Sequence, residues 1–110
     1  MGYKEDEEKY KEWANILKAL SYPVRLYIVE YLSSGERSVG EIGKKLHLDL
    51  STVSRHLSTL RRVGIIKDEK RGNQVFYSLK IPCVLNFLKC SEDVVRENLE
   101  NKLKFLDRKD

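Results

Sequence analysis

The chain has 110 residues, of which 41% are hydrophobic and 35% are charged, and its formal net charge is +4. This length and composition fit a single globular domain over residues 1–110 and argue against a disordered chain. No apolar stretch is long enough to span a bilayer, and the first twelve residues are mostly charged, so we expect neither a membrane protein nor a signal peptide. We expect a cytoplasmic protein, in which Cys83 and Cys90 stay reduced and form no structural disulfide.

The apolar pattern predicts four helices, a two-stranded hairpin and a last helix. The first helix covers about residues 5–20 and is apolar along one side. The second follows Pro23, a residue suited to a first helical turn, and ends at residues 33–35. The third is short, and Ser38 is expected to cap it while Glu41 completes a capping box.

A tight turn over residues 47–50 leads into the fourth predicted helix. Asp49 or Ser51 is expected to cap this helix, which runs to about Val63 before Gly64 closes it. Two helices joined by such a turn form a helix-turn-helix, whose second helix enters the major groove of DNA.

The two sides of the fourth helix differ in chemistry. One side is apolar and is expected to face the core: Val53, Leu57 and Leu60. The other side carries hydroxyls and arginines and no acid: Ser51, Arg55, Ser58 and Arg62, flanked by Thr52, Ser54 and Thr59. Short hydroxyls let a helix approach base edges, and arginine binds guanine or phosphate, so the second side is the predicted DNA-reading surface.

A hairpin follows, with predicted strands at residues 65–69 and 74–79. Its turn is expected to hold four residues: Lys70, Arg71, Gly72 and Asn73. Residues 50–80 hold seven basic and two acidic side chains, whereas the rest of the chain holds 14 basic and 15 acidic side chains. The excess positive charge therefore lies in the fourth helix and the hairpin, as a phosphate-binding surface requires. We expect Lys70, Arg71 and Asn73 to reach DNA beside the groove that the fourth helix enters.

The last predicted helix follows Pro82 and runs from about Cys83 to Leu106. Two neighbouring apolar stripes run along it: Val84, Leu88, Val95, Leu99 and Leu106 on one, and Cys83, Phe87, Cys90 and Val94 on the other. A helix that is apolar on two sides usually has two neighbours. We expect one neighbour to be the chain's own domain and the other to be a second subunit.

Four stretches of the sequence carry a family resemblance: LKALSYPVRL at 17–26, STVSRHLSTL at 51–60, VGII at 63–66 and RGNQVFYSL at 71–79. Together they resemble the ArsR/SmtB family of bacterial and archaeal repressors, over about residues 13–90. The resemblance implies a mainly α fold with a small β-hairpin wing, a winged helix-turn-helix that dimerises through its first and last helices. It also implies repression of a nearby operon, relieved by a metal, metalloid or redox signal. The matching DNA-contact positions are Ser51, Thr52, Ser54 and Arg55, with Arg71 and Asn73 on the wing.

The sensing sites of that family do not match this sequence. Residues 37–41 hold no cysteine where arsenic- or lead-sensing members carry Cys-x-Cys, and the last helix has no histidine for a zinc or nickel site. No cofactor is therefore assigned with certainty. Cys83 and Cys90 are either packing residues or the effector site. As an effector site they suit an arsenite-type metalloid or another thiophilic metal first, and a reactive sulfur or redox signal second.

The spacing of Cys83 and Cys90 limits how they could act together. Seven residues along a helix separate them by ~10.5 Å along the axis. A disulfide joins Cα atoms only ~4.4–6.8 Å apart. The two thiols could meet if the helix starts after Cys83, or if the last helices of two subunits run antiparallel across the dimer axis.

Nothing in the sequence indicates an enzyme, because it lacks a glycine-rich phosphate loop, an HExxH motif and a Ser/His/Asp set. His56 is expected to be a packed structural residue. The predicted function is a sequence-specific repressor that binds inverted-repeat operator DNA as a homodimer and is released by a thiol-reactive effector. One alternative is a DNA-binding regulator without a small-molecule effector, in which the cysteines are only structural. Another is a winged-helix module for protein contacts, against which the basic segment and the acid-free helix face argue.

Overall fold

The computed structural model describes residues 2–108. In chain order its elements are the 3-10 turn η1 (Tyr3–Asp6), helices α1 (Glu7–Ala19) and α2 (Pro23–Leu32), strand β1 (Arg37–Ser38), helices α3 (Val39–Leu46) and α4 (Leu50–Arg62), strands β2 (Ile66–Arg71) and β3 (Gln74–Leu79), and helix α5 (Cys83–Asp107). The mainly α fold with a β-hairpin wing is confirmed. No helix among these described residues is both long and apolar enough to cross a membrane.

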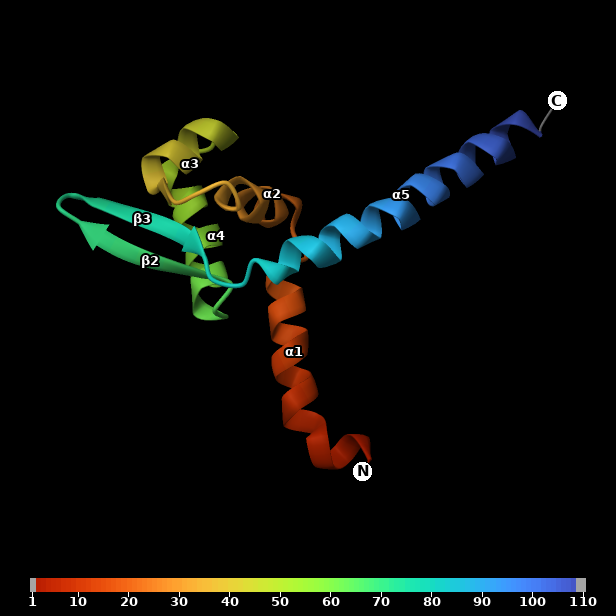
Figure 1. Cartoon of the computed structure of the whole chain (residues 1–110), viewed down its shortest axis with the longest axis horizontal. Helices are drawn as coiled ribbons and strands as arrows, with labels where there is room; N and C mark the ends of the chain where they lie inside the picture. Colours follow the sequence, from red (N-terminus) through yellow and green to blue (C-terminus); the bar gives the residue numbers. More distant parts are fainter. Residues whose placement is uncertain (1, 109–110) are drawn as a thin grey trace.

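The molecule consists of a body and two arms (Figure 1). The body holds α2, α3, α4 and the sheet, whereas α1 and α5 extend from it in different directions. The Cα radius of gyration is 17.9 Å, against ~13 Å expected for a compact chain of this length. The excess comes from the two arms, most of whose described residues are exposed.

The core lies between the helices of the body and the start of the wing. Its fully buried side chains come from α2, α3, α4 and the residues just after α4: Ile28, Val29, Ile42, Val53, Leu57, Leu60, Ile65 and Ile66. The expected inner face of α4 is therefore confirmed. Each arm contributes only its end nearest the body, with Ala19 and Leu20 from α1 and Val84 from α5.

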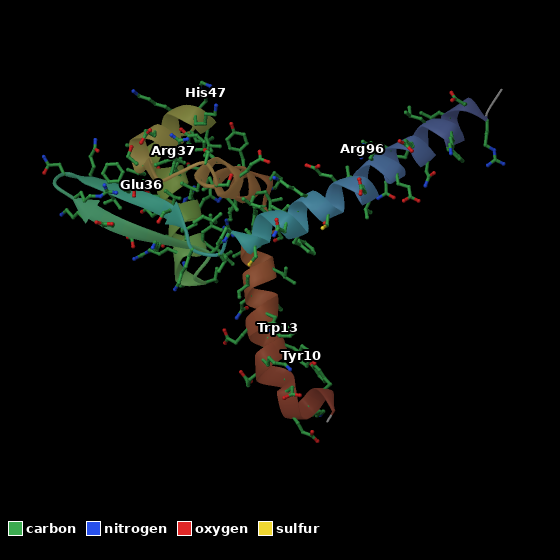
Figure 2. All side chains as sticks on the ribbon, in the orientation of Figure 1. Tyr10, Trp13, Glu36, Arg37, His47 and Arg96 are labelled. Carbon is green, nitrogen blue, oxygen red and sulfur yellow. The ribbon has the colours of Figure 1, made fainter. Side chains whose placement is uncertain are left out.

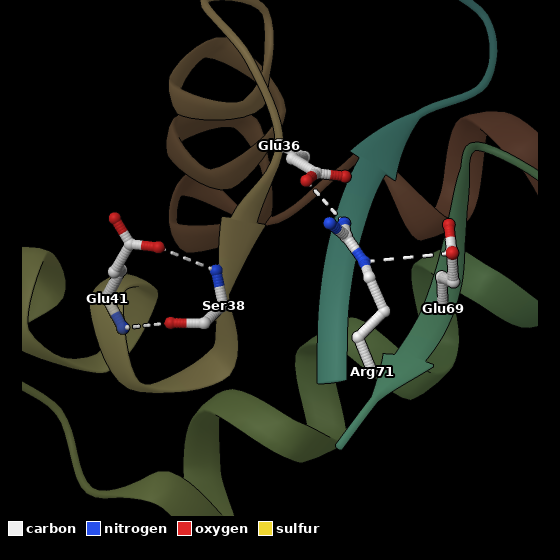
Figure 3. Close-up of polar contacts among 5 residues, drawn as sticks. All are labelled: Glu36, Ser38, Glu41, Glu69 and Arg71. Carbon is white, nitrogen blue, oxygen red and sulfur yellow. Dashed lines mark hydrogen bonds and ion pairs between the residues drawn. The ribbon is translucent and has the colours of Figure 1, made fainter. Parts of the chain in front are cut away.

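The caps of α3 and α4 define the helix-turn-helix. The Ser38 hydroxyl accepts a 3.1 Å hydrogen bond from the Glu41 amide, and the Glu41 carboxylate accepts a 3.0 Å bond from the Ser38 amide (Figure 3). This capping box was predicted. The Asp49 carboxylate caps α4 by accepting a 3.0 Å bond from the Thr52 amide. Ser51, the other predicted cap, lies inside the first turn, where its hydroxyl donates to Asp49. That alternative is wrong.

The turn between α3 and α4 packs closely against α3. A Cβ atom on the buried Gly43 would lie 3.1 Å from a methyl of Leu50 and 3.6 Å from the carbonyl oxygen of Leu48. His47 ends α3 in the left-handed conformation, with a φ of 56°. The close approach at Gly43 and the reversal at His47 together set the angle at which α4 leaves the turn.

The wing differs from the prediction at both ends. Gly64 has a φ of 87°, and the amides of Gly64 and Ile65 bond back to the carbonyls of Arg61 and Leu60, each at 3.0 Å. These are the two bonds of a Schellman motif, so Ile65 still belongs to the helix end and β2 begins one residue later than predicted. At the far end Lys70 pairs with Val75 and Arg71 pairs with Gln74.

The hairpin turn therefore holds two residues rather than four. Gly72 has a φ of 61°, whereas Asn73 does not have a positive φ. This is the pattern of a type II′ turn, which takes glycine at its first central position. Lys70 and Arg71 are strand residues, and their side chains project from β2 beside the turn.

The sheet has a third strand that was not predicted. Arg37 and Ser38 form β1, which pairs antiparallel with β3 opposite Tyr77 and Phe76, so that β3 lies in the middle. Two residues are too few for an apolar alternation, and only the partner strand defines them as a strand. This pairing ties the start of α3 to the wing.

Candidate nucleic-acid interface

The polar side of α4 is open to solvent along its length. Its predicted contact residues are exposed at Ser51, Ser54, Arg55 and Arg62, and half-buried at Thr52 and Ser58. They share one helix face because Val53, Leu57 and Leu60 on the opposite face are fully buried in the core. The structure therefore brings the predicted helix residues together on one surface.

The arginines of α4 differ in their partners. Arg61 forms an ion pair with Asp68 of β2 at 3.7 Å. None of the ion pairs in residues 2–108 involves Arg55 or Arg62. Hydrogen bonds with Thr52 and, further, the charge of Arg55 lower the pKa of Asp49, but neither Arg55 nor Arg62 is held in an ion pair, which leaves both available to a phosphate or a guanine.

The wing residues lie apart from α4, at the tip of the β2–β3 hairpin (Figure 1). Lys70, Arg71 and Asn73 are all exposed. Arg71 hydrogen-bonds to the carboxylate of Glu36 and lies 3.7 Å from the carboxylate of Glu69 (Figure 3). Its guanidinium also covers the ring of Phe76 at 4.2 Å. The hydrogen bond to Glu36 raises the pKa of Arg71. The predicted wing contact is therefore neutralised within the chain, which its sequence position did not indicate.

His56 has the structural role expected of it. It is half-buried, and its Nδ1 accepts a 3.1 Å hydrogen bond from Nε of Arg25. Burial lowers the pKa of His56, and the charges of Arg25 and Arg55 lower it further. The bond fixes the neutral ring with its proton on Nε2.

Arg25 is the residue that sequence reasoning missed. Its Nη1 also donates a 3.1 Å hydrogen bond to the carbonyl oxygen of Ala19, so the side chain ties the end of α1 to α4. The sequence signal that could have indicated Arg25 is its place in the PVRL stretch, two residues after the proline that starts α2. The contact between Arg25 and His56 could not be predicted from the sequence, because the two residues lie 31 positions apart.

Both cysteines are free and exposed, and both lie within α5. The option that the helix starts after Cys83 is wrong, because α5 begins at Cys83. Within one helix the two side chains stay too far apart for a disulfide. The part of the chain that the structure describes contains no group of three or more His, Cys, Asp or Glu residues that could hold a metal ion.

Apolar side chains line both arms and face solvent. On α5 the predicted stripes face the body only at Val84 and Leu88. Seven large apolar side chains of the helix are more than half exposed: Phe87, Val94, Val95, Leu99, Leu103, Phe105 and Leu106. On α1, Trp13 lies edge-on against Tyr10, with ring centroids 5.5 Å apart, well away from the body (Figure 2). Contiguous exposed apolar surface of this kind marks an interaction site.

The chain matches known transcription regulators. A family model described as "Bacterial regulatory protein, arsR family" matches residues 22–68. An HTH-type transcriptional regulator from Mycobacterium tuberculosis is 33% identical over 104 residues, covering 94% of this chain and 91% of the relative.

Two solved structures share the fold over most of their length. The crystal structure of the transcriptional repressor BigR from Xylella fastidiosa gives a TM-score of 0.69 at 34% identity, covering 86% of this chain and 96% of that one. The solution structure of a homodimeric winged helix-turn-helix domain from Mycobacterium bovis, a possible ArsR-family regulator, gives a TM-score of 0.75 at 27% identity. The match covers 92% of each chain. All three similar proteins are described as transcription regulators, so the expectation of a regulator rather than an enzyme is confirmed.

Proposed function

Since this chain belongs to the ArsR family of bacterial regulatory proteins, we propose that it is a sequence-specific transcriptional repressor that binds operator DNA as a homodimer. The observation that carries the proposal is the polar face of α4. It presents hydroxyls and two arginines without ion-pair partners, and it lies opposite a fully buried apolar face. A repressor of this kind acts in the cytoplasm.

In the complex, the polar face of α4 enters the major groove. The proposed groove residues are Ser51, Thr52, Ser54, Arg55, Ser58 and Arg62. The hydroxyls allow close approach to base edges and phosphates, and Arg55 donates two hydrogen bonds to a guanine. Lys70, Arg71 and Asn73 of the wing contact the flanking backbone, and Arg71 does so only after leaving Glu36.

The exposed apolar faces of α1 and α5 support the homodimer. Pairing them across a two-fold axis removes apolar surface from water, which stabilises small domains with little core of their own. The similar domain from Mycobacterium bovis is a homodimer. Two-fold symmetry predicts an operator made of inverted half-sites ~10 bp apart, centre to centre.

The direct test is selection of bound duplexes from a random pool, followed by gel shifts on the selected sequence. The proposal predicts enrichment of an inverted repeat that the protein binds at least ~1000-fold more tightly than a scrambled duplex. Equal affinity for the two duplexes would overturn sequence-specific binding, and enrichment of a single half-site would overturn the dimeric mode.

The proposed effector site is the pair Cys83 and Cys90, acting between subunits. Both thiols are exposed on the arm that carries the apolar stripes. Antiparallel α5 helices would bring Cys83 of one protomer toward Cys90 of its partner. Arsenous acid would bind there by exchanging two of its hydroxyls for the sulfurs of two thiols, and the two thiol protons would leave with those hydroxyls as two water molecules. Peroxide would instead oxidise the two thiols to a disulfide and be reduced to two water molecules.

The effector proposal and its alternative predict different responses of the double variant Cys83→Ser, Cys90→Ser. If the thiols are the effector site, arsenite, polysulfide or peroxide releases the wild type from DNA and leaves the variant bound. If the cysteines only pack in the dimer, wild type and variant respond identically to all three reagents. The second result identifies a regulator without a thiol effector and leaves the DNA-binding proposal intact.

A further inference from the structure

Three arginines surround one open hollow on the surface between α2 and α4. The hollow measures about 450 Å³ and is lined by Arg25, Arg55, His56, Ser58, Thr59 and Arg62. No carboxylate is among these residues. Two of the arginines, Arg55 and Arg62, belong to the polar face of α4, whereas Arg25 comes from α2.

Arg25 is held in place on three sides. It donates from Nε to His56 Nδ1 and from Nη1 to the Ala19 carbonyl oxygen, both at 3.1 Å, and its guanidinium stacks on the ring of Tyr22 at 4.1 Å. All three partners are neutral. The bonds orient the guanidinium and leave its charge uncompensated, and Nη2 has no hydrogen bond within residues 2–108.

The charges around the hollow are unbalanced. His56 cannot supply a counter-charge, because its ring is neutral and already accepts from Arg25. Glu12 is the carboxylate of an adjoining hollow of about 610 Å³ on the α1 side, which Lys18, Arg25 and Arg62 also line. Asp49, whose pKa is lowered by hydrogen bonds with Thr52 and further by the charge of Arg55, lines neither hollow. The lining of that adjoining hollow still holds three cationic side chains against one carboxylate. Guanidinium groups that share a hollow repel one another, so an anion placed between them would be bound favourably.

We propose that this hollow binds a phosphate of the DNA backbone, with Arg25 of α2 as a phosphate ligand beside Arg55 and Arg62. The inference rests on the proposed function, because the hollow is continuous with the face of α4 that enters the groove. A helix in the major groove lies between two phosphate backbones, and contacts to them fix its position without reading sequence. The hydroxyl of Ser58 lines the same hollow and could donate to that phosphate, whereas the Thr59 hydroxyl donates to the carbonyl oxygen of Arg55 at 3.2 Å. His56 is a positioning residue, since it acts through Arg25.

The test compares two replacements of Arg25 on the selected operator and on an unrelated duplex. In Arg25→Gln, the slope of log K against log salt should become shallower by ~0.9 per subunit on both duplexes, because one phosphate contact is lost. Affinity should fall by the same factor on both, so the preference for operator stays unchanged. Arg25→Lys keeps the charge and should keep the wild-type slope.

A matched control separates this site from general charge and from stability. Arg96→Gln removes the same charge on the α5 arm, where Arg96 pairs with Asp93, and should leave the slope unchanged. Thermal unfolding of each variant reports the structural role of Arg25. An Arg25→Gln variant that unfolds at a lower temperature but keeps the wild-type salt slope would overturn the phosphate site.

Two further comparisons separate failure of this inference from failure of the proposed function. If wild type shows no preference for any selected duplex, the proposed function fails and this inference fails with it. If wild type prefers the operator but Arg25→Gln keeps the wild-type slope of log K against log salt, only this inference fails. Inorganic phosphate, added at submillimolar concentration and constant ionic strength, probes a free anion. Should phosphate raise the unfolding temperature of wild type and not of Arg25→Gln, the hollow is a free-anion site and its assignment to DNA is overturned.

Discussion

The guanidinium of Arg71, at the end of β2, reaches across the central strand β3 to hydrogen-bond the carboxylate of Glu36 beside β1 (Figure 3). Glu69 lies on its other side, and the ring of Phe76 on β3 lies beneath it. The wing arginine therefore already has carboxylate partners where DNA would offer a phosphate. Binding DNA through Arg71 requires exchanging one anion for the other.

We expect Glu36→Gln to strengthen binding to every duplex by at most several-fold. The substitution removes the competing anion, and the gain stays small because exposed ion pairs contribute little. Glu8→Gln is the matched control, because Glu8 lies near the far end of α1, where it pairs with Lys11. Fluorescence anisotropy titrations at two salt concentrations measure the effect. Weaker binding than the control variant would show that Glu36 orients Arg71 for DNA instead of competing with it.

Stability should depend on pH through His56. Its pKa in the folded protein is below the usual value of 6.5, so the unfolded chain binds more protons. The stability that the neutral form of His56 contributes is fully present above its usual pKa of 6.5. It is lost as the pH falls from 6.5 toward the lower pKa of the folded protein. The groups that face the ring are cationic: Arg25 from α2, Arg55 from α4 and Arg62 at the rim of the hollow. Protonation would also break the bond from Arg25.

Urea unfolding at a series of pH values from about 7.5 to about 5 checks this prediction. His56→Gln is the control, since an amide oxygen can accept from Arg25 but does not titrate in this range. The free energy of unfolding of the wild type should fall more steeply with decreasing pH than that of the variant. Parallel curves for the two proteins would mean that His56 is not the titrating group.

Self-association should depend on the apolar face of α5. Leu99→Glu places a charge among exposed apolar side chains, where burial in an interface would be costly. Arg96→Glu introduces the same side chain at an exposed position of the same helix that is already polar. Sedimentation velocity at micromolar concentration should find a dimer for wild type and Arg96→Glu and a monomer for Leu99→Glu. A dimeric Leu99→Glu variant would place the interface elsewhere.

Local and periodic features of this fold were predictable from sequence. The inner face of α4 and the capping box at Ser38 follow from spacing along a single helix, and both are confirmed. Features that depend on distant partners were not. The strand at Arg37 exists only through its pairing with β3, and the contact between Arg71 and Glu36 joins residues 35 positions apart. Sequence therefore locates the polar face of α4, whereas the charge balance around it requires the fold.

The contribution of Arg25 illustrates the same limit at the proposed DNA surface. Its position beside Pro23 marks the start of α2, which the sequence shows. Its approach to Arg55 and Arg62 depends on how α2 packs against α4, which the sequence does not show. Counting the basic residues of the segment 50–80 therefore leaves out Arg25, one of the three arginines that line the hollow.

The most direct test of the proposed function compares Arg55→Ala with Arg61→Ala in operator binding. Both remove one positive charge from α4, but Arg55 lies on the exposed polar face without an ion pair, whereas Arg61 pairs with Asp68. Quantitative gel shifts on operator and scrambled duplex should show that Arg55→Ala loses ~1–3 kcal/mol on the operator, with a smaller loss on the scrambled duplex. Arg61→Ala should lose little on either. Wild-type operator affinity in Arg55→Ala would contradict the assignment of α4 as the helix that reads DNA.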